Sequence, residues 1–239
     1  MPIKRCALVS IAVLWVAGLG SPASIAADNP MLSARAAEDP ALDPNPSSPF
    51  WSAAHPVTID LGNDGKKLPS YATEVRSRWT SGNLYFLFRC PYEELYLKPN
   101  PDMVHETNEL WNWDVAEVFI GSDFSNIRRY KEFEVSPRGE WVDLDIDLSK
   151  THPEEGWLWN SGLKVAVRVD EAAKVWYAAL RIPFNAISPR PAAENLEFRI
   201  NLYLSEGPPS NHKSLAWHPT LVKNFHIPER FGTLKLVGR

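Results

Sequence analysis

Ten short segments with alternating apolar and polar residues constrain the fold of this chain more than any other feature. Alternation with period 2 places one face of a strand against a core and the other toward solvent. Apart from a possible short helix at 188–195, no long stretch has the 3.6-residue period of a helix. The segments are 55–60, 74–80, 84–90, 115–121, 130–136, 140–147, 163–169, 175–182, 196–204 and 232–237. This pattern predicts an all-β fold, an antiparallel β-sandwich of the immunoglobulin or jelly-roll kind with long loops.

The start of the chain has a different composition. Two basic residues precede an apolar run, and Ser24-Ile25-Ala26 offers small residues to a signal peptidase, so residues 1–26 are expected to be a signal peptide. The run is shorter than the roughly 20 apolar residues that span a bilayer. Residues 27–49 contain five prolines, which favours a flexible leader. We therefore expect a secreted or periplasmic protein, with no membrane contact after cleavage, whose domain spans residues 50–239.

Charge and cysteine content exclude some classes of partner and of stabilisation. The chain has 25 basic and 29 acidic residues and a net charge of −4, so there is no broad positive field for nucleic acid. Cleavage at residue 26 would remove Cys6 and leave Cys90 alone. Because one cysteine cannot form an internal disulfide, stability must come from a hydrophobic core.

Residues 110–120 carry the strongest sign of a binding site. An aromatic turn with Trp111 and Trp113 leads directly into a strand in which Glu117 is an acid among apolar residues. Period-2 alternation places Glu117 on the face opposite Ala116, Val118 and Ile120. A carboxylate can accept hydrogen bonds from hydroxyl groups, while an indole offers a flat apolar surface. A sugar requires both kinds of contact.

Several fragments in a fixed order resemble the family-9 carbohydrate-binding modules, which are related to the DOMON sandwich domains. The similarity covers about residues 50–238. The fragments are Trp111-x-x-Asp114-x-x-Glu117-Val118-Phe119, Tyr130-x-Glu132-Phe133-x-Val135-x-Pro137-x-Gly139, Ile182-Pro183, Arg199-x-Asn201, Trp217-His218-Pro219 and Phe231-Gly232-x-Leu234. The resemblance implies a β-sandwich that holds a sugar unit at a chain end between two tryptophans.

The resemblance also implies roles for particular residues. By position, Trp111 corresponds to the first clamp residue, with Trp113 as its rival, and Glu117 corresponds to the acid six residues later. Arg138 corresponds to a basic contact with the hydroxyls, and Trp217 to the second clamp residue, although Lys213-Ser214-Leu215-Ala216 departs from the expected polar residues. The function implied is that of a secreted, non-catalytic carbohydrate-binding protein. It would bind mono- or oligosaccharides or polysaccharide ends and support polysaccharide breakdown.

Two other functions stay open from the residues alone. An exported b-type haem domain would need Met103 with a partner such as His105 or His226 as axial ligands. A glycoside hydrolase, either accessory or catalytic, would need two carboxylates at a separation that a sequence does not reveal.

No cofactor is predicted, and no metal ligands are assigned. Asp143-x-Asp145-x-Asp147 imitates the first half of a calcium loop, but Leu148 stands where the glycine is required. Family-9 modules can carry structural calcium, so the resemblance leaves a calcium site open without residues to name.

Overall fold

A computed structural model describes residues 29–150 and 157–238, so the predicted signal peptide lies outside the described residues. The strands are β1 Met31–Arg35, β2 Val57–Ile59, β3 Leu61–Gly62, β4 Thr73–Trp79, β5 Asn83–Pro91, β6 Val115–Gly121, β7 Arg129–Val135, β8 Trp141–Asp147, β9 Lys164–Asp170, β10 Val175–Pro183, β11 Glu197–Glu206, β12 Lys213–Ala216 and β13 Gly232–Val237. They form one large sheet in the order β8-β7-β6-β11-β13-β1-β4-β5-β10-β9, with β12 on β11 and β3, and β2 on β4.

The helical elements are short and connect the strands. They are α1 Phe184–Ile187 and the 3-10 turns η1 Pro49–Trp51, η2 Pro69–Tyr71, η3 Leu110–Asn112, η5 Pro209–Asn211 and η6 Pro228–Arg230. The helix predicted at 188–195 is wrong, because the one α-helical turn of the described chain ends before it. Among the described helices, none has the length and apolar character needed to cross a membrane.

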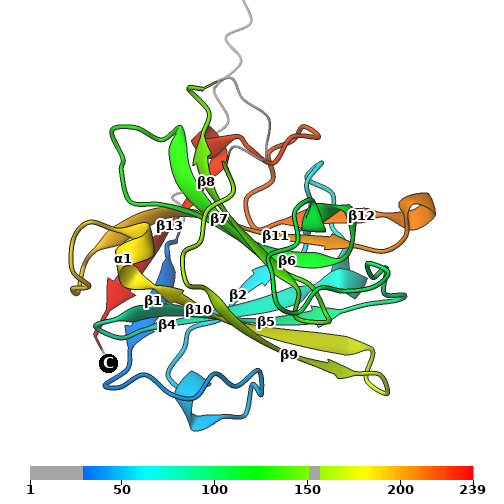
Figure 1. The fold of residues 1–239 in the computed structure, drawn as a ribbon, viewed down its shortest axis with the longest axis horizontal. Coiled ribbons are helices and arrows are strands. Elements are labelled where there is room, and N and C mark those ends of the chain that lie inside the picture. The colour runs from blue at the N-terminus through cyan, green and yellow to red at the C-terminus, as the bar shows by residue number, and fades with distance from the viewer. Residues whose placement is uncertain (1–28, 151–156, 239) are drawn as a thin grey trace, which may run out of the picture.

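The sheet curves so that its two halves lie face to face (Figure 1). One half holds β6, β7, β8 and β11, and the other holds β4, β5, β9 and β10. Apolar side chains of both halves meet in a single core, in which Val118 and Phe133 come from the first half and Phe86 and Trp176 from the second. The predicted all-β sandwich is confirmed.

The predicted strands agree closely with the observed ones, because each half buries one face and so preserves a clear alternation. All ten predicted segments coincide with a strand, and their ends differ from the observed ends by at most two residues. Three strands were not predicted: β1, β3 and β12. β3 and β12 have two and four residues, which is too short for a period-2 pattern to be recognised.

The prediction of a flexible leader before residue 50 is wrong. β1 lies in the middle of the sheet and pairs in parallel with β13 on one side and β4 on the other. Met31 is fully buried in the main core, and the Arg78 guanidinium donates hydrogen bonds to the backbone oxygens of Ala34 and Arg35 at 2.9 and 2.8 Å. The surrounding prolines obscured a five-residue strand that is itself free of proline. The domain therefore begins at or before Met31.

A truncation tests the role of β1. We expect a chain that begins at Ala37 to be less stable than one that begins at Asn29 by at least about 3 kcal/mol, because it loses a buried methionine and two strand pairings. For a domain of this size the loss lowers the melting temperature by roughly 6–12 °C. Equal melting temperatures in thermal denaturation would show that β1 contributes nothing, as a mobile leader would.

Candidate functional site

A second apolar layer covers the outer face of the β6-β7-β8-β11 half, on the side away from the main core. It contains Phe119, Tyr130, Leu144 and Tyr203, with Trp111 packed against it. The alternation predicted for 115–121 is observed, since Ala116, Val118 and Ile120 lie in the main core while Phe119 lies in the outer layer. A cavity of about 270 Å³ opens at this outer layer. Its described lining residues are Trp111, Glu117, Phe119, Glu132, Leu144, Trp157, Ser205, His212, Ser214, Lys223, Asn224, Phe225 and His226.

One wall of the cavity is the loop of residues 217–231, which connects β12 to β13. Phe225 stacks on Tyr203 with ring centroids 4.4 Å apart and planes 6° apart, and the Tyr203 hydroxyl donates to the Phe225 backbone oxygen at 2.9 Å. The Tyr130 hydroxyl and His226 Nδ1 lie 2.6 Å apart, which is within hydrogen-bond distance. These aromatic and polar contacts fix the loop over the sheet, so the cavity is preformed.

The turn that carries Trp111 is anchored by the residue just before β6. The Asp114 carboxylate accepts hydrogen bonds from the backbone N–H groups of Tyr96, at 2.8 Å, and of Gly207, at 2.7 Å. Burial nevertheless raises the pKa of Asp114 to about 6, because the two bonds offset only part of the desolvation. Asp114 therefore ties η3 to two other loops, and this holds Trp111 at the cavity.

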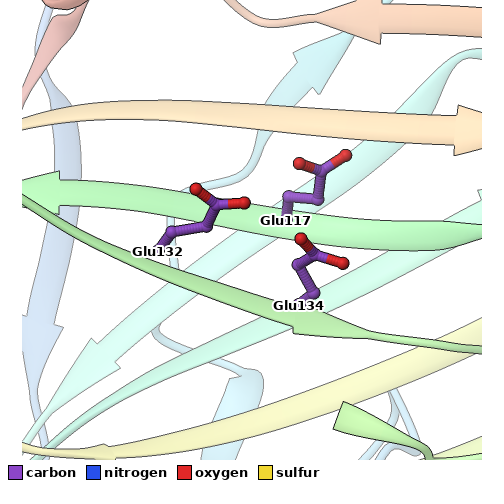
Figure 2. A group of neighbouring side chains, drawn as sticks. All are labelled: Glu117, Glu132 and Glu134. Carbon is purple, nitrogen blue, oxygen red and sulfur yellow. The ribbon is translucent and has the colours of Figure 1, made fainter. Parts of the chain in front are cut away.

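Three buried carboxyl groups gather on the outer face of β6 and β7. Figure 2 shows Glu117 on β6 beside Glu132 and Glu134 on β7, with the three side chains on the same side of the two strands. One oxygen from each lies within 4.8 Å of the others. The strand register explains the cluster, since Glu117 is directly opposite Glu134 and Phe119 is directly opposite Glu132. Like charges opposite one another destabilise a sheet, so an arrangement of this kind costs stability.

Glu117 is the acid of this cluster whose partners are best defined. Its side chain is 2% exposed, and its Oε1 accepts a hydrogen bond from Ser205 Oγ at 3.2 Å. Among the described residues, Glu117 Oε2 has no hydrogen-bond partner, although Glu117 lines the cavity. Burial, and then the nearby Glu132 carboxylate, raise the pKa of Glu117 well above its usual value. One oxygen of this carboxyl group is thus available to a ligand.

His226 is a neutral neighbour of the acids. Burial lowers its pKa to about 4, so the imidazole is uncharged at neutral pH. Its Nδ1 lies 4.0 Å from Glu132 Oε2. At neutral pH the imidazole therefore takes part in hydrogen bonding and does not neutralise the carboxylates.

The structure brings two of the four predicted site residues together. Trp111 and Glu117 line the same cavity, while Trp113, the rival of Trp111, is not among the described lining residues. Trp217 packs against the main core, with its ring edge-on to His218 at a centroid distance of 4.1 Å. A Cβ on Gly232 would lie 2.9 Å from the Trp217 ring, so this side chain fills a close-packed position away from the cavity. Trp217 directly follows the last residue of β12, and from this position its side chain packs against the main core.

Arg138 also lies away from the cavity. It is exposed in the hairpin between β7 and β8, where its guanidinium donates to the backbone oxygen of Lys98 at 3.0 Å. Sequence reasoning missed Trp157, Phe225 and His226, which do line the cavity. Trp157 belongs to the aromatic sequence Trp157-Leu158-Trp159 and could have been noticed, whereas Phe225 and His226 reach the site only through the path of the 217–231 loop.

The residues proposed for haem do not converge. Met103 has half of its surface exposed, and His105 is exposed with its Nδ1 3.0 Å from Asp102 Oδ2. Neither residue is among the described residues that line the cavity of His226. The three aspartates at 143, 145 and 147 lie on a regular strand, where Asp145 pairs with Lys131 at 2.6 Å. They do not form a calcium loop.

A family comparison agrees with this geometry. The family described as "Carbohydrate family 9 binding domain-like" matches residues 45–239. The chain belongs to this family. The resemblance to this family that the sequence indicated is thereby confirmed, and the family-9 match includes β6 and β7, which carry the acids at the cavity.

Solved structures share the same fold at low sequence identity. A family-9 carbohydrate-binding module from Caldicellulosiruptor kristjanssonii in complex with cellotriose has a TM-score of 0.64 and 12% identity, with 88% of this chain and 95% of that chain covered. A putative carbohydrate-binding protein from Bacteroides uniformis has a TM-score of 0.69 and 15% identity, covering 86% and 97%. The Caldicellulosiruptor module in complex with glucose gives 0.62 and 12%, covering 87% and 96%. No curated protein sequence matches this chain.

The raised pKa of Glu117 predicts how stability depends on pH. A carboxyl group whose folded pKa exceeds its unfolded value of 4.5 contributes its full stability below about pH 4.5 and loses it as the pH rises. We therefore expect Glu117→Gln, which keeps the shape and cannot ionise, to gain stability relative to the wild type as the pH increases from 4 to 8. Thermal denaturation across this range measures the difference.

The matched control is Glu197→Gln, because Glu197 is a glutamate on β11 whose side chain is exposed. Its melting temperature should follow that of the wild type at every pH. A Glu117→Gln variant that is less stable than the wild type by the same amount at pH 4 and pH 8 would contradict the electrostatic explanation.

Proposed function

We propose that this protein binds carbohydrate and holds a sugar unit in the cavity on the outer face of β6, β7 and β11. The observation that carries the proposal is the presence of Trp111, Trp157 and Glu117 around one preformed cavity in a family-9 domain. Its volume of about 270 Å³ is at the lower end of ligand pockets, which are typically about 300–1,000 Å³. A cavity of this size suits a small ligand or the end of a chain.

The lining matches the two kinds of surface that a sugar ring presents. Indole rings contact the apolar C–H faces of a pyranose, and buried acids accept hydrogen bonds from its hydroxyl groups. Glu117 Oε2 offers such an acceptor at the cavity. We propose Trp157 in place of Trp217 as the second aromatic contact, and we assign no contact at this cavity to Arg138.

The comparisons support the class of ligand. The Caldicellulosiruptor modules of the same fold are complexes with cellotriose and with glucose, which makes glucose and its β-linked oligomers the first sugars to test. The proposed role is non-catalytic. The description of the family, which names binding and no reaction, supports this role. The apolar run near the start of the chain supports export to the periplasm or the medium as part of the proposal.

The aromatic contact is tested by comparing two tryptophans of one turn. Trp111→Ala should abolish most sugar binding, because an aromatic anchor commonly dominates the affinity of a small site. Trp113→Ala is the matched control and should bind with nearly wild-type affinity. Calorimetric titration with glucose and cellotriose measures both. Equal losses in the two folded variants would place the sugar elsewhere.

The acid is tested by Glu117→Gln. Ser205 Oγ donates to one oxygen of residue 117, so in the variant the amide oxygen is expected to keep that bond and the NH₂ group to take the place of the free acceptor. Hydrogen bonds to charged groups are worth about 1.5–3 kcal/mol, so at a pH high enough to ionise Glu117 the variant should bind roughly ten-fold or more weakly than the wild type. Wild-type affinity should rise with pH as Glu117 ionises, while the variant should show no such rise. Equal affinities of the variant and the wild type across this pH range would remove Glu117 from the site.

A further inference from the structure

A second hollow lies next to the cavity, beside the 217–231 loop. This groove has a volume of about 740 Å³ and is bordered by the turn of residues 62–68 and by the Leu221–Phe225 part of the loop. It shares His212, Ser214, Lys223 and Phe225 with the lining of the cavity. The cavity and the groove are therefore adjacent.

The groove presents apolar side chains on a rigid support. Leu221 and Val222 are each more than half exposed. The Asn63 side chain donates to the Val222 backbone oxygen at 2.7 Å and accepts from Thr220 N at 2.8 Å, and Leu221 N donates to the Asn63 backbone oxygen at 2.9 Å. The loop is thus held with its apolar side chains directed outward. Exposing such side chains to water is unfavourable unless a ligand covers them.

The groove is bordered by basic side chains. Three lysines border the groove, and of these Lys66 pairs with Asp64 at 2.8 Å. Lys213 donates to the Asn211 side-chain oxygen at 2.5 Å. Among the described residues, neither Lys213 nor Lys223 forms an ion pair with a carboxylate. Within the described chain, the groove thus carries two lysines without a carboxylate partner, and one of them, Lys223, also borders the cavity that holds the buried acids.

We propose that the ligand is an oligosaccharide whose terminal unit is uncharged and lies in the cavity, and whose next unit carries a carboxylate that lies in the groove beside Lys213 and Lys223. Leu221 and Val222 would contact the C–H face of that second unit. The acids of the cavity disfavour an anionic terminal unit, while the lysines favour an anionic neighbour. This inference rests on the proposed sugar site and adds the length and the charge of the ligand.

The experiment compares three probes by calorimetry at low salt: glucose, cellotriose, and the cellotriose analogue with glucuronic acid as its middle unit. The middle position is next to the terminal unit whichever chain end enters the cavity. We expect cellotriose to bind more tightly than glucose, and the acidic trisaccharide to bind about three- to five-fold more tightly than cellotriose. The acidic preference should shrink at 0.5 M NaCl, because Lys223 is exposed and Lys213 is only partly buried, so salt screens both charges.

Two variants assign these effects to the groove. Lys213→Met should remove most of the acidic preference and leave glucose binding unchanged, whereas Lys164→Met, on the exposed edge strand β9, should preserve the preference. Leu221→Asn should reduce the gain in affinity between glucose and the trisaccharides. Asparagine is chosen because it tolerates the left-handed backbone of this position, where φ is 65°.

The outcomes separate this inference from the proposed function. If glucose binds and both trisaccharides bind no more tightly, the groove is not a subsite and the inference is overturned while the sugar site stands. Equal affinity for neutral and acidic trisaccharides overturns it as well. If none of the three probes binds, both proposals fail.

Discussion

The site depends on the contact between the 217–231 loop and the outer face of β6, β7 and β11. A sheet half in a sandwich normally has one buried face and one solvated face, and here the second face is also covered, by aromatic side chains. Phe119 is the centre of this layer, with ring contacts to Tyr130, Tyr203, His226 and Phe231. Without that layer the acids on β6 and β7 would be hydrated surface groups, and Trp111 would have no preformed cavity to line.

Covering that face has an electrostatic cost, because it buries ionisable side chains. The presence of acids there despite this cost favours a binding role. Burial raises the pKa of Glu117 and lowers that of His226, so in both cases the folded structure disfavours the charged form. A domain selected for stability alone would place apolar residues at these positions, since buried ionised groups are expensive unless paired. The retained acid with an oxygen directed to a cavity is what the recognition of hydroxyl groups requires.

The sequence allowed the fold to be predicted almost completely, and the site only in part. Strands such as β6 and β10 alternate clearly because one of their faces is buried in a continuous core. β1 was missed because the prolines on either side of it indicated an irregular segment. Its five residues form a strand because they pair with β13 on one edge and β4 on the other. That Trp111 and Glu117 lie close together could be predicted because they belong to one turn and the strand that follows it, so their relation is local in sequence.

The remaining site residues depend on how distant segments meet. Trp217 was expected at the site by its position in the family pattern, but the first residues of the loop turn its ring into the main core. Phe225 reaches the site through stacking on Tyr203, a contact between residues 22 positions apart that no periodicity encodes. The groove beside the cavity is likewise formed by the 62–68 turn and a loop about 160 residues later along the chain.

A crystal structure of the protein with cellotriose or its acidic analogue bound would test the proposed sugar site most directly. We expect a sugar ring in the cavity, in contact with Trp111 and Trp157, with a hydroxyl within hydrogen-bond distance of Glu117 Oε2. A sugar bound at another surface with the cavity empty, for example beside Arg138, would contradict the proposed site.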